Sequence, residues 1–156
     1  MNPAFPNEKS RVQLARDSSL AGEHRVLGEG VPASFRFVLG AEQDLMPAIE
    51  LQTRGGLKDS ITASWRPVAH ARAYYLHAMG SVGENDLVLW SSAETPDTGM
   101  GLFDYLPNAT TERWLREKVL LSPATSQCAL PKGIFAPPEG RAFGRRGEGG
   151  AMLRMI

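Results

Sequence analysis

Side chains that could carry out hydrolysis are spread through the middle of the chain. His77 is followed by Ser92, Asp97 and Asp104, and a serine nucleophile needs a histidine base that a carboxylate orients. Glu94, with the same two aspartates, offers the paired carboxylates of glycosidic chemistry. The Gly-x-Ser-x-Gly pentapeptide of a nucleophile elbow is absent. The pattern leaves a loop-built Ser/His/Asp or carboxylate hydrolase open as an alternative, and it predicts no catalytic residue.

Metal ligation and disulfide bonding find little support in the sequence. His70 and His77 stand seven positions apart, whereas two ligands on one strand are usually two apart and two on a helix four apart. Cys128 is the single cysteine, which excludes an internal disulfide and a cysteine-clustered zinc site. We therefore expect no metal and no cofactor.

Charge does not mark the chain as a nucleic-acid or membrane-surface protein. Its 17 basic residues balance its 17 acidic residues, so no net field steers it toward a polyanion. Arg141, Arg145 and Arg146 lie in a stretch rich in glycine and proline, which predicts a mobile loop over residues 137–150. Contact of single-stranded nucleic acid with these arginines is a weaker alternative function.

The two ends of the sequence bear on domain organisation and compartment. Residues 1–20 are polar and lack an apolar signal-peptide core, and they predict a flexible lead-in before one domain at 21–156. The chain stops on the apolar run AMLRMI, where a natural terminus is more often polar. We therefore expect either a fragment of a longer protein or a last strand that is tucked into a sheet. If the chain is a fragment of an exported protein, we expect a periplasmic or secreted setting.

Short alternating runs predict a mainly β protein. Residues 35–39 and 61–65 alternate apolar with polar side chains at the period of a strand. Residues 71–79 and 87–92 flank a turn of Gly, Asn and Asp, as two strands of a hairpin do. One helix is expected at about 110–120 from its spaced apolar residues and i,i+4 charge pairs.

The stretch from Ile61 to Leu76 resembles the second and third strands of fibronectin type III and related immunoglobulin-like modules. The residues that carry the resemblance are Trp65, Pro67, Ala71 and Tyr74. They stand where those modules have an inward tryptophan, a proline, an alanine and a tyrosine. The resemblance covers about twenty residues and implies an antiparallel β-sandwich with the helix as an insertion.

A sheet that is apolar on both faces must be covered on both faces, and this requirement motivates the binding prediction. Period two directs Tyr75 and His77 away from the core, while Trp90 lies in the uninterrupted apolar run LVLW. The predicted helix, through its Trp114, is expected to cover the outer face of the hairpin. If a protein partner or a second copy covers it instead, Tyr75, His77 and Trp90 are the candidate binding residues. The leading hypothesis is a non-enzymatic binding or assembly module of a larger bacterial-type protein.

Overall fold

The computed structural model describes residues 13–15, 17–82, 86–97, 99–103, 105–136 and 150–156, and it divides into two compact units. Unit 1 is Met1–Met46 and unit 2 is Pro47–Ile156. The sequence suggested one domain at 21–156, whereas the structure places a division between Met46 and Pro47. Each unit is therefore described by itself.

Unit 1 is built around a two-stranded antiparallel hairpin. Strand β1 (Gly22–Arg25) pairs with β2 (Arg36–Leu39), with His24 opposite Phe37. The rings of these two residues stack at a centroid distance of 5.2 Å. A short 3-10 turn, η2 (Ala41–Gln43), follows β2. None of the described residues of unit 1 is buried, so the hairpin has no core of its own.

Asp44 ties the segment before β1 to the segment after η2. Its carboxylate accepts hydrogen bonds from the hydroxyl of Ser19 at 2.7 Å and from the backbone N–H groups of Leu20 and Leu45 at 2.6 and 2.8 Å. The Ser19 hydroxyl first, and then the two amides, lower the pKa of the Asp44 carboxyl below its ordinary value because they stabilise the charged form.

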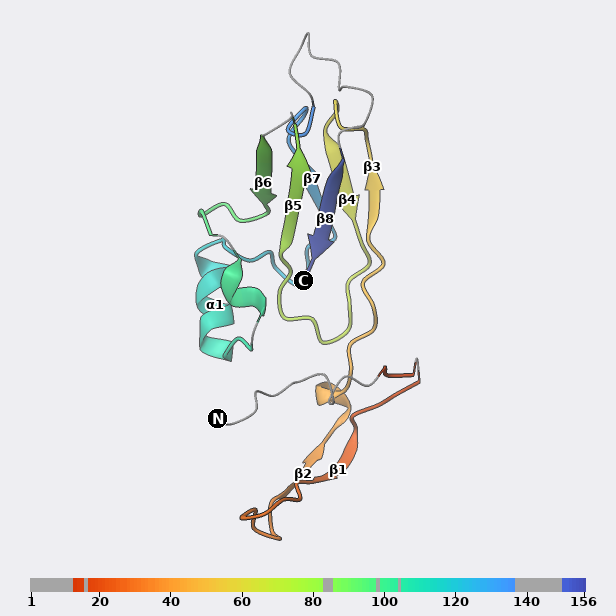
Figure 1. Ribbon diagram of the computed structural model, residues 1–156, viewed down its shortest axis with the longest axis vertical. Helices are drawn as coiled ribbons and strands as arrows, with labels where there is room; N and C mark the ends of the chain where they lie inside the picture. Colours follow the sequence, from red (N-terminus) through yellow and green to blue (C-terminus); the bar gives the residue numbers. More distant parts are fainter. Residues whose placement is uncertain (1–12, 16, 83–85, 98, 104, 137–149) are drawn as a thin grey trace. The chain divides into compact units, whose positions relative to one another are not determined.

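Unit 2 contains two three-stranded antiparallel sheets (Figure 1). The first has the strand order β3-β4-β7 and the second has the order β6-β5-β8. The strands of the first sheet are β3 (Gln52–Arg54), β4 (Ile61–Ser64) and β7 (Gln127–Leu130). Those of the second sheet are β5 (Leu76–Ser81), β6 (Leu87–Ser91) and β8 (Ala151–Met155). The mainly β composition predicted from the alternating runs is confirmed.

The two sheets of unit 2 share one buried cluster. Trp65, directly after β4, and Tyr74, just before β5, meet edge to face with ring centroids 5.5 Å apart. The Tyr74 hydroxyl accepts a hydrogen bond from the N–H of Val68 at 2.8 Å. The expectation that Trp65 is a core residue is confirmed, since it is 5% exposed. The cluster consists of Ala63, Trp65, Tyr74, Leu76, Ala78, Leu130 and Phe135.

Helix α1 (Asn108–Arg116) follows a 3-10 turn, η3 (Met100–Phe103). It was expected at about 110–120, but it begins earlier and ends at Arg116. The reason is a Schellman motif: the N–H of Val119 donates to the Trp114 carbonyl, and that of Lys118 to the Leu115 carbonyl. Lys118 takes the left-handed φ of 58° that this motif requires, so the backbone turns out of the helix before Leu120.

Replacing Trp65 with alanine tests the core. The change deletes a large buried ring from the cluster shared by both sheets, so we expect unit 2 to lose about 3–5 kcal/mol of unfolding free energy. Urea denaturation followed by circular dichroism measures this loss. Arg66→Ala, at the adjacent exposed position, is the control and should change stability by less than about 0.5 kcal/mol. A loss below about 1 kcal/mol for Trp65→Ala would contradict the core assignment.

The hydrogen bonds that the Asp44 carboxylate accepts should depend on pH. A carboxyl whose pKa is lowered in the folded state contributes stability above the ordinary Asp value of about 3.9, and this contribution disappears as the pH falls through the folded pKa. We expect the amide proton shifts of Leu20 and Leu45 to titrate together with an apparent pKa below that value. Nuclear magnetic resonance measures these shifts. Asp44→Asn should abolish the titration of these shifts, and Asp17→Asn should preserve it. An apparent pKa at or above the ordinary Asp value would contradict the hydrogen bonds to the Asp44 carboxylate.

Candidate functional site

The predicted binding residues lie on two different faces of the β6-β5-β8 sheet. His77 is opposite Ser91 of β6 and Arg154 of β8, on the face turned away from the core. Trp90 is opposite Ala78 and packs against the buried cluster. Trp90 therefore belongs to the inner face, and it does not form a common surface with His77.

Tyr75 is turned away from the core, as predicted, but it is covered within the chain. Its side chain is only 2% exposed, and its hydroxyl donates a hydrogen bond to the Asp97 carbonyl at 3.1 Å. Gly99 lies directly on the ring: a Cβ placed there would be 2.7 Å from a Tyr75 ring carbon. In this conformation Tyr75 supports a loop and is not accessible to a partner.

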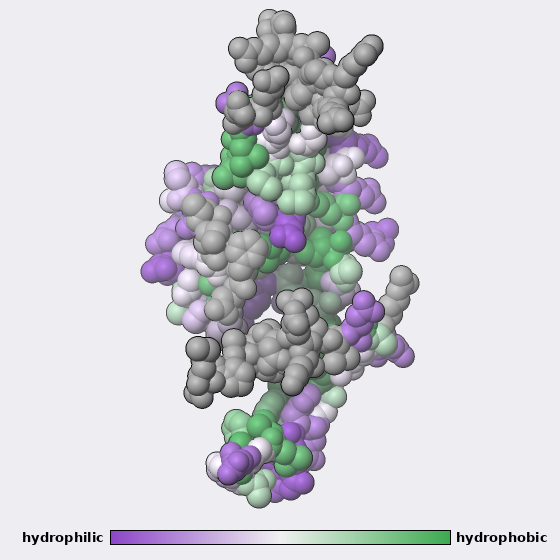
Figure 2. All heavy atoms as spheres, viewed as in Figure 1, coloured by the Kyte–Doolittle hydropathy of each residue, from purple (hydrophilic) through white to green (hydrophobic). Residues whose placement is uncertain are grey.

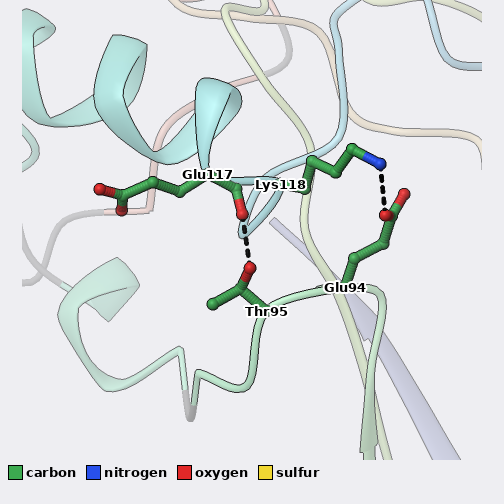
Figure 3. A network of polar contacts seen from close by, with 4 residues as sticks. All are labelled: Glu94, Thr95, Glu117 and Lys118. Atoms are coloured by element: carbon green, nitrogen blue, oxygen red, sulfur yellow. Dashed lines mark hydrogen bonds and ion pairs between the residues drawn. The ribbon is translucent and has the colours of Figure 1, made fainter.

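The segment that covers Tyr75, residues 94–97 and 99–101, is anchored to the end of α1 (Figure 3). The Thr95 hydroxyl donates to the Glu117 carbonyl at 2.6 Å, and the Lys118 ammonium contacts the Glu94 carboxylate at 2.6 Å. The Glu94 N–H also donates to the Lys118 carbonyl. The left-handed turn of Lys118 thus presents both its backbone and its side chain to this cover segment.

Trp114 packs against the cover segment. A Cβ placed on Gly101 would lie 3.0 Å from the Trp114 ring, so the helix supports the segment that covers Tyr75. Figure 1 shows α1 beyond the end of β6, and Leu87 and Leu89 on the outer face of that strand are exposed. The expectation that the helix covers the outer face of the hairpin is therefore wrong for β6. Residues 94 and 95, which follow β6, bind the C-terminal end of α1.

The outer face of the β6-β5-β8 sheet carries a row of exposed apolar side chains. Leu89, Met79 and Met152 lie opposite one another on the three strands, and their side chains are 71%, 38% and 49% exposed. Leu87, two residues before Leu89 and on the same face, is 60% exposed. Figure 2 shows hydrophobic atoms gathered over this part of the sheet. We call these four residues the apolar face.

The outer face of the β3-β4-β7 sheet is polar by comparison. Thr62 lies between Arg54 and Ala129, and Ser64 lies between Gln52 and Gln127. One chain therefore has a sheet with an ordinary solvated face and a sheet with an apolar one. The outward direction of Met79 could be inferred from the sequence, because successive side chains along its strand alternate between the two faces. The positions of Leu87, Leu89 and Met152 beside it depend on strand register, which the sequence did not reveal.

The hydrolytic arrangement is not assembled among the described residues. The Ser92 hydroxyl accepts a hydrogen bond from the Leu76 N–H at 3.0 Å, and the Asp97 carboxylate accepts one from the Gly99 N–H at 2.7 Å. His77 has a buried Nε2 atom without a hydrogen-bond partner in the described structure, and its ring lies 6.4 Å from that of Tyr75. Asp104 is outside the described residues.

Other candidate groups show no assembled site. Among the described residues, no cluster of three or more His, Cys, Asp or Glu side chains could hold a metal ion. Cys128 is half-buried in β7, and burial raises the pKa of its thiol because it penalises the thiolate. The predicted mobile loop 137–150, with Arg141, Arg145 and Arg146, falls outside the described residues except for Gly150.

Comparison with known proteins gives no match to a family model, to a curated protein or to a solved structure. In the part of the chain that the structure describes, no helix has the length and apolar character needed to cross a membrane.

Substitution of Gly99 tests the packing of the cover segment on Tyr75. Gly99 and Gly133 both have a φ of +69°, but a Cβ on Gly133 would meet no atom closer than 3.9 Å. We expect Gly133→Ala to cost about 1–2 kcal/mol from the left-handed backbone alone. Gly99→Ala should cost about 1–3 kcal/mol more, because it also overpacks the ring.

Urea denaturation measures both costs, and oxidative footprinting with mass spectrometry reports the accessibility of Tyr75. Gly99→Ala should increase labelling of Tyr75, whereas Gly133→Ala should not. Equal stability losses and unchanged labelling in the two variants would show that Gly99 does not hold the cover on the ring.

Proposed function

We propose that unit 2 is a non-enzymatic β-sandwich module of the immunoglobulin-like type that binds a protein partner in an assembly. The support for the sandwich class is the cluster shared by two three-stranded sheets, an arrangement typical of sandwiches. Trp65 and Tyr74, which carry the resemblance to fibronectin type III modules, meet inside that cluster.

The observation that carries the binding proposal is the difference between the two outer faces. Exposed apolar side chains in one contiguous row are uncommon on a monomeric protein and are typical of interaction sites. Leu87, Leu89, Met79 and Met152 form such a row. Arg154 and His77 lie opposite each other on the same face, two residues along their strands from Met152 and Met79. They place polar groups at the border of the row. An apolar centre with a polar rim is the usual composition of a protein interface.

A binding role agrees better with the described contacts than a hydrolytic one. A nucleophile and its base must come within hydrogen-bonding distance, whereas the Ser92 hydroxyl accepts a hydrogen bond from a backbone amide. The carboxylate of Asp97 is used to shape the turn at Gly99. The Asp97 carboxylate thus helps to hold the cover segment in place.

Site-specific photo-cross-linking tests the proposal. A benzophenone amino acid at Met79 should give discrete protein adducts in the source cells, because the face is apolar and in contact with a partner. The same group at Thr62, on the polar outer face of the other sheet, is the matched control and should give none. Leu87→Lys combined with Met152→Lys should remove the adducts at Met79. Equal labelling at Met79 and Thr62, or no adduct at Met79, would contradict a binding role for the apolar face.

A further inference from the structure

The described residues of unit 2 form four edge strands, which differ in how they are protected from pairing with another chain. Natural proteins block such pairing with short strands, charges or prolines at sheet edges. Strand β3 is three residues long and ends in Arg54, β7 is followed by Pro131, and β8 contains Arg154. Strand β6, with the sequence Leu-Val-Leu-Trp-Ser, has neither a charge nor a proline.

The backbone of β6 alternates between its neighbour β5 and the open edge. The Ser92 N–H donates to the Leu76 carbonyl and the Val82 N–H to the Asp86 carbonyl, and their register makes the even-numbered residues of β6 face β5. The N–H and C=O groups of Leu87, Leu89 and Ser91 therefore point outward. The described structure shows no hydrogen bond from these outward groups to another residue, and Figure 1 shows β6 as the outermost strand of its layer.

We propose that β6 pairs antiparallel with β6 of a second copy of this chain, about a two-fold axis at Leu89. In this register Leu89 lies opposite Leu89 of the second copy, and Leu87 lies opposite Ser91. Each outward N–H then meets an outward C=O, so the pairing uses every free backbone group of the strand. A two-fold interface brings the same surface of each copy together, and an uncharged strand can meet its own sequence without repulsion.

Two features of β6 favour a second copy of this chain. The strand carries no charge, so two copies can meet about Leu89 without repulsion. The pairing also continues the apolar face, because the row Met152, Met79 and Leu89 of one copy joins the same row of the other across the axis. This inference goes beyond the proposed function, since it assigns the open edge of β6 to self-association and leaves the apolar face to the protein partner.

Disulfide trapping tests the register directly. In a Cys128→Ala background, Leu89→Cys should form a disulfide-linked dimer on mild oxidation. The Cα atoms of a hydrogen-bonded pair of opposite residues lie about 5.5 Å apart, within the range of a disulfide. Met152→Cys, which is also exposed but lies on β8, is the control and should not cross-link. Leu87→Cys alone should also fail, whereas Leu87→Cys with Ser91→Cys should succeed.

Removal of one outward N–H group tests the pairing of β6 without cross-linking. Leu89→Pro deletes the outward N–H at the two-fold axis and leaves the bonds to β5 intact, since a proline is tolerated where the N–H of an edge strand faces solvent. Sedimentation analysis over a concentration series should show the dimer Kd rising about tenfold or more. Leu89→Ala keeps the donor and separates the loss of the side chain from the loss of the hydrogen bond.

The outcomes separate this inference from the proposed function. A chain that stays monomeric at every concentration, or a dimer that Leu89→Cys does not trap, overturns the β6 pairing even if Met79 still cross-links to a partner. A dimer that Leu89→Cys traps supports the pairing even if the apolar face captures nothing. A monomer that Leu89→Pro destabilises would show that another part of the same chain covers the edge, and this too would overturn the inference.

Discussion

The edge-to-face contact of Trp65 with Tyr74 is the interaction on which the rest of unit 2 depends. The chain leaves the β3-β4-β7 sheet at Trp65 and enters the β6-β5-β8 sheet after Tyr74, so this pair joins the two sheets. Tyr74 also exchanges both backbone hydrogen bonds with Leu121, and its hydroxyl receives the Val68 N–H. A residue held through its backbone, its ring and its hydroxyl has little rotational freedom left, and it determines which face of β5 is turned inward.

The surface chemistry of the second sheet follows from this orientation. With Leu76 and Ala78 buried against the first sheet, successive residues alternate, and Tyr75, His77 and Met79 must point outward. Gly99 covers Tyr75, and Thr95 and Glu94 anchor this cover segment to the end of α1. The cover stops short of Met79, so the apolar row beyond it stays exposed. Burial of Tyr75 and exposure of Met79 are thus two results of one strand orientation.

Part of this organisation could be predicted from residues near one another in the sequence. The alternation of Ile61, Ala63 and Trp65 identified a strand with its tryptophan in the core, and the turn before β6 identified a hairpin. The helix was found from its periodic apolar residues, but its end was misplaced. Lys118 is not a residue that usually takes the left-handed conformation of a helix end, so the sequence contained no sign that the helix would stop before Leu120.

The sequence by itself determined the mainly β composition, the buried position of Trp65 and the outward direction of Tyr75, because strand periodicity and side-chain hydrophobicity are local properties. The tertiary structure decided which outward residues remain accessible. Trp90 became an inner residue and Leu89 an outer one through the register with β5, and Tyr75 was covered by a glycine far from it in the chain. Register and cover depend on hydrogen bonds and packing between distant segments, and those pairings cannot be read from the spacing of residues within one segment.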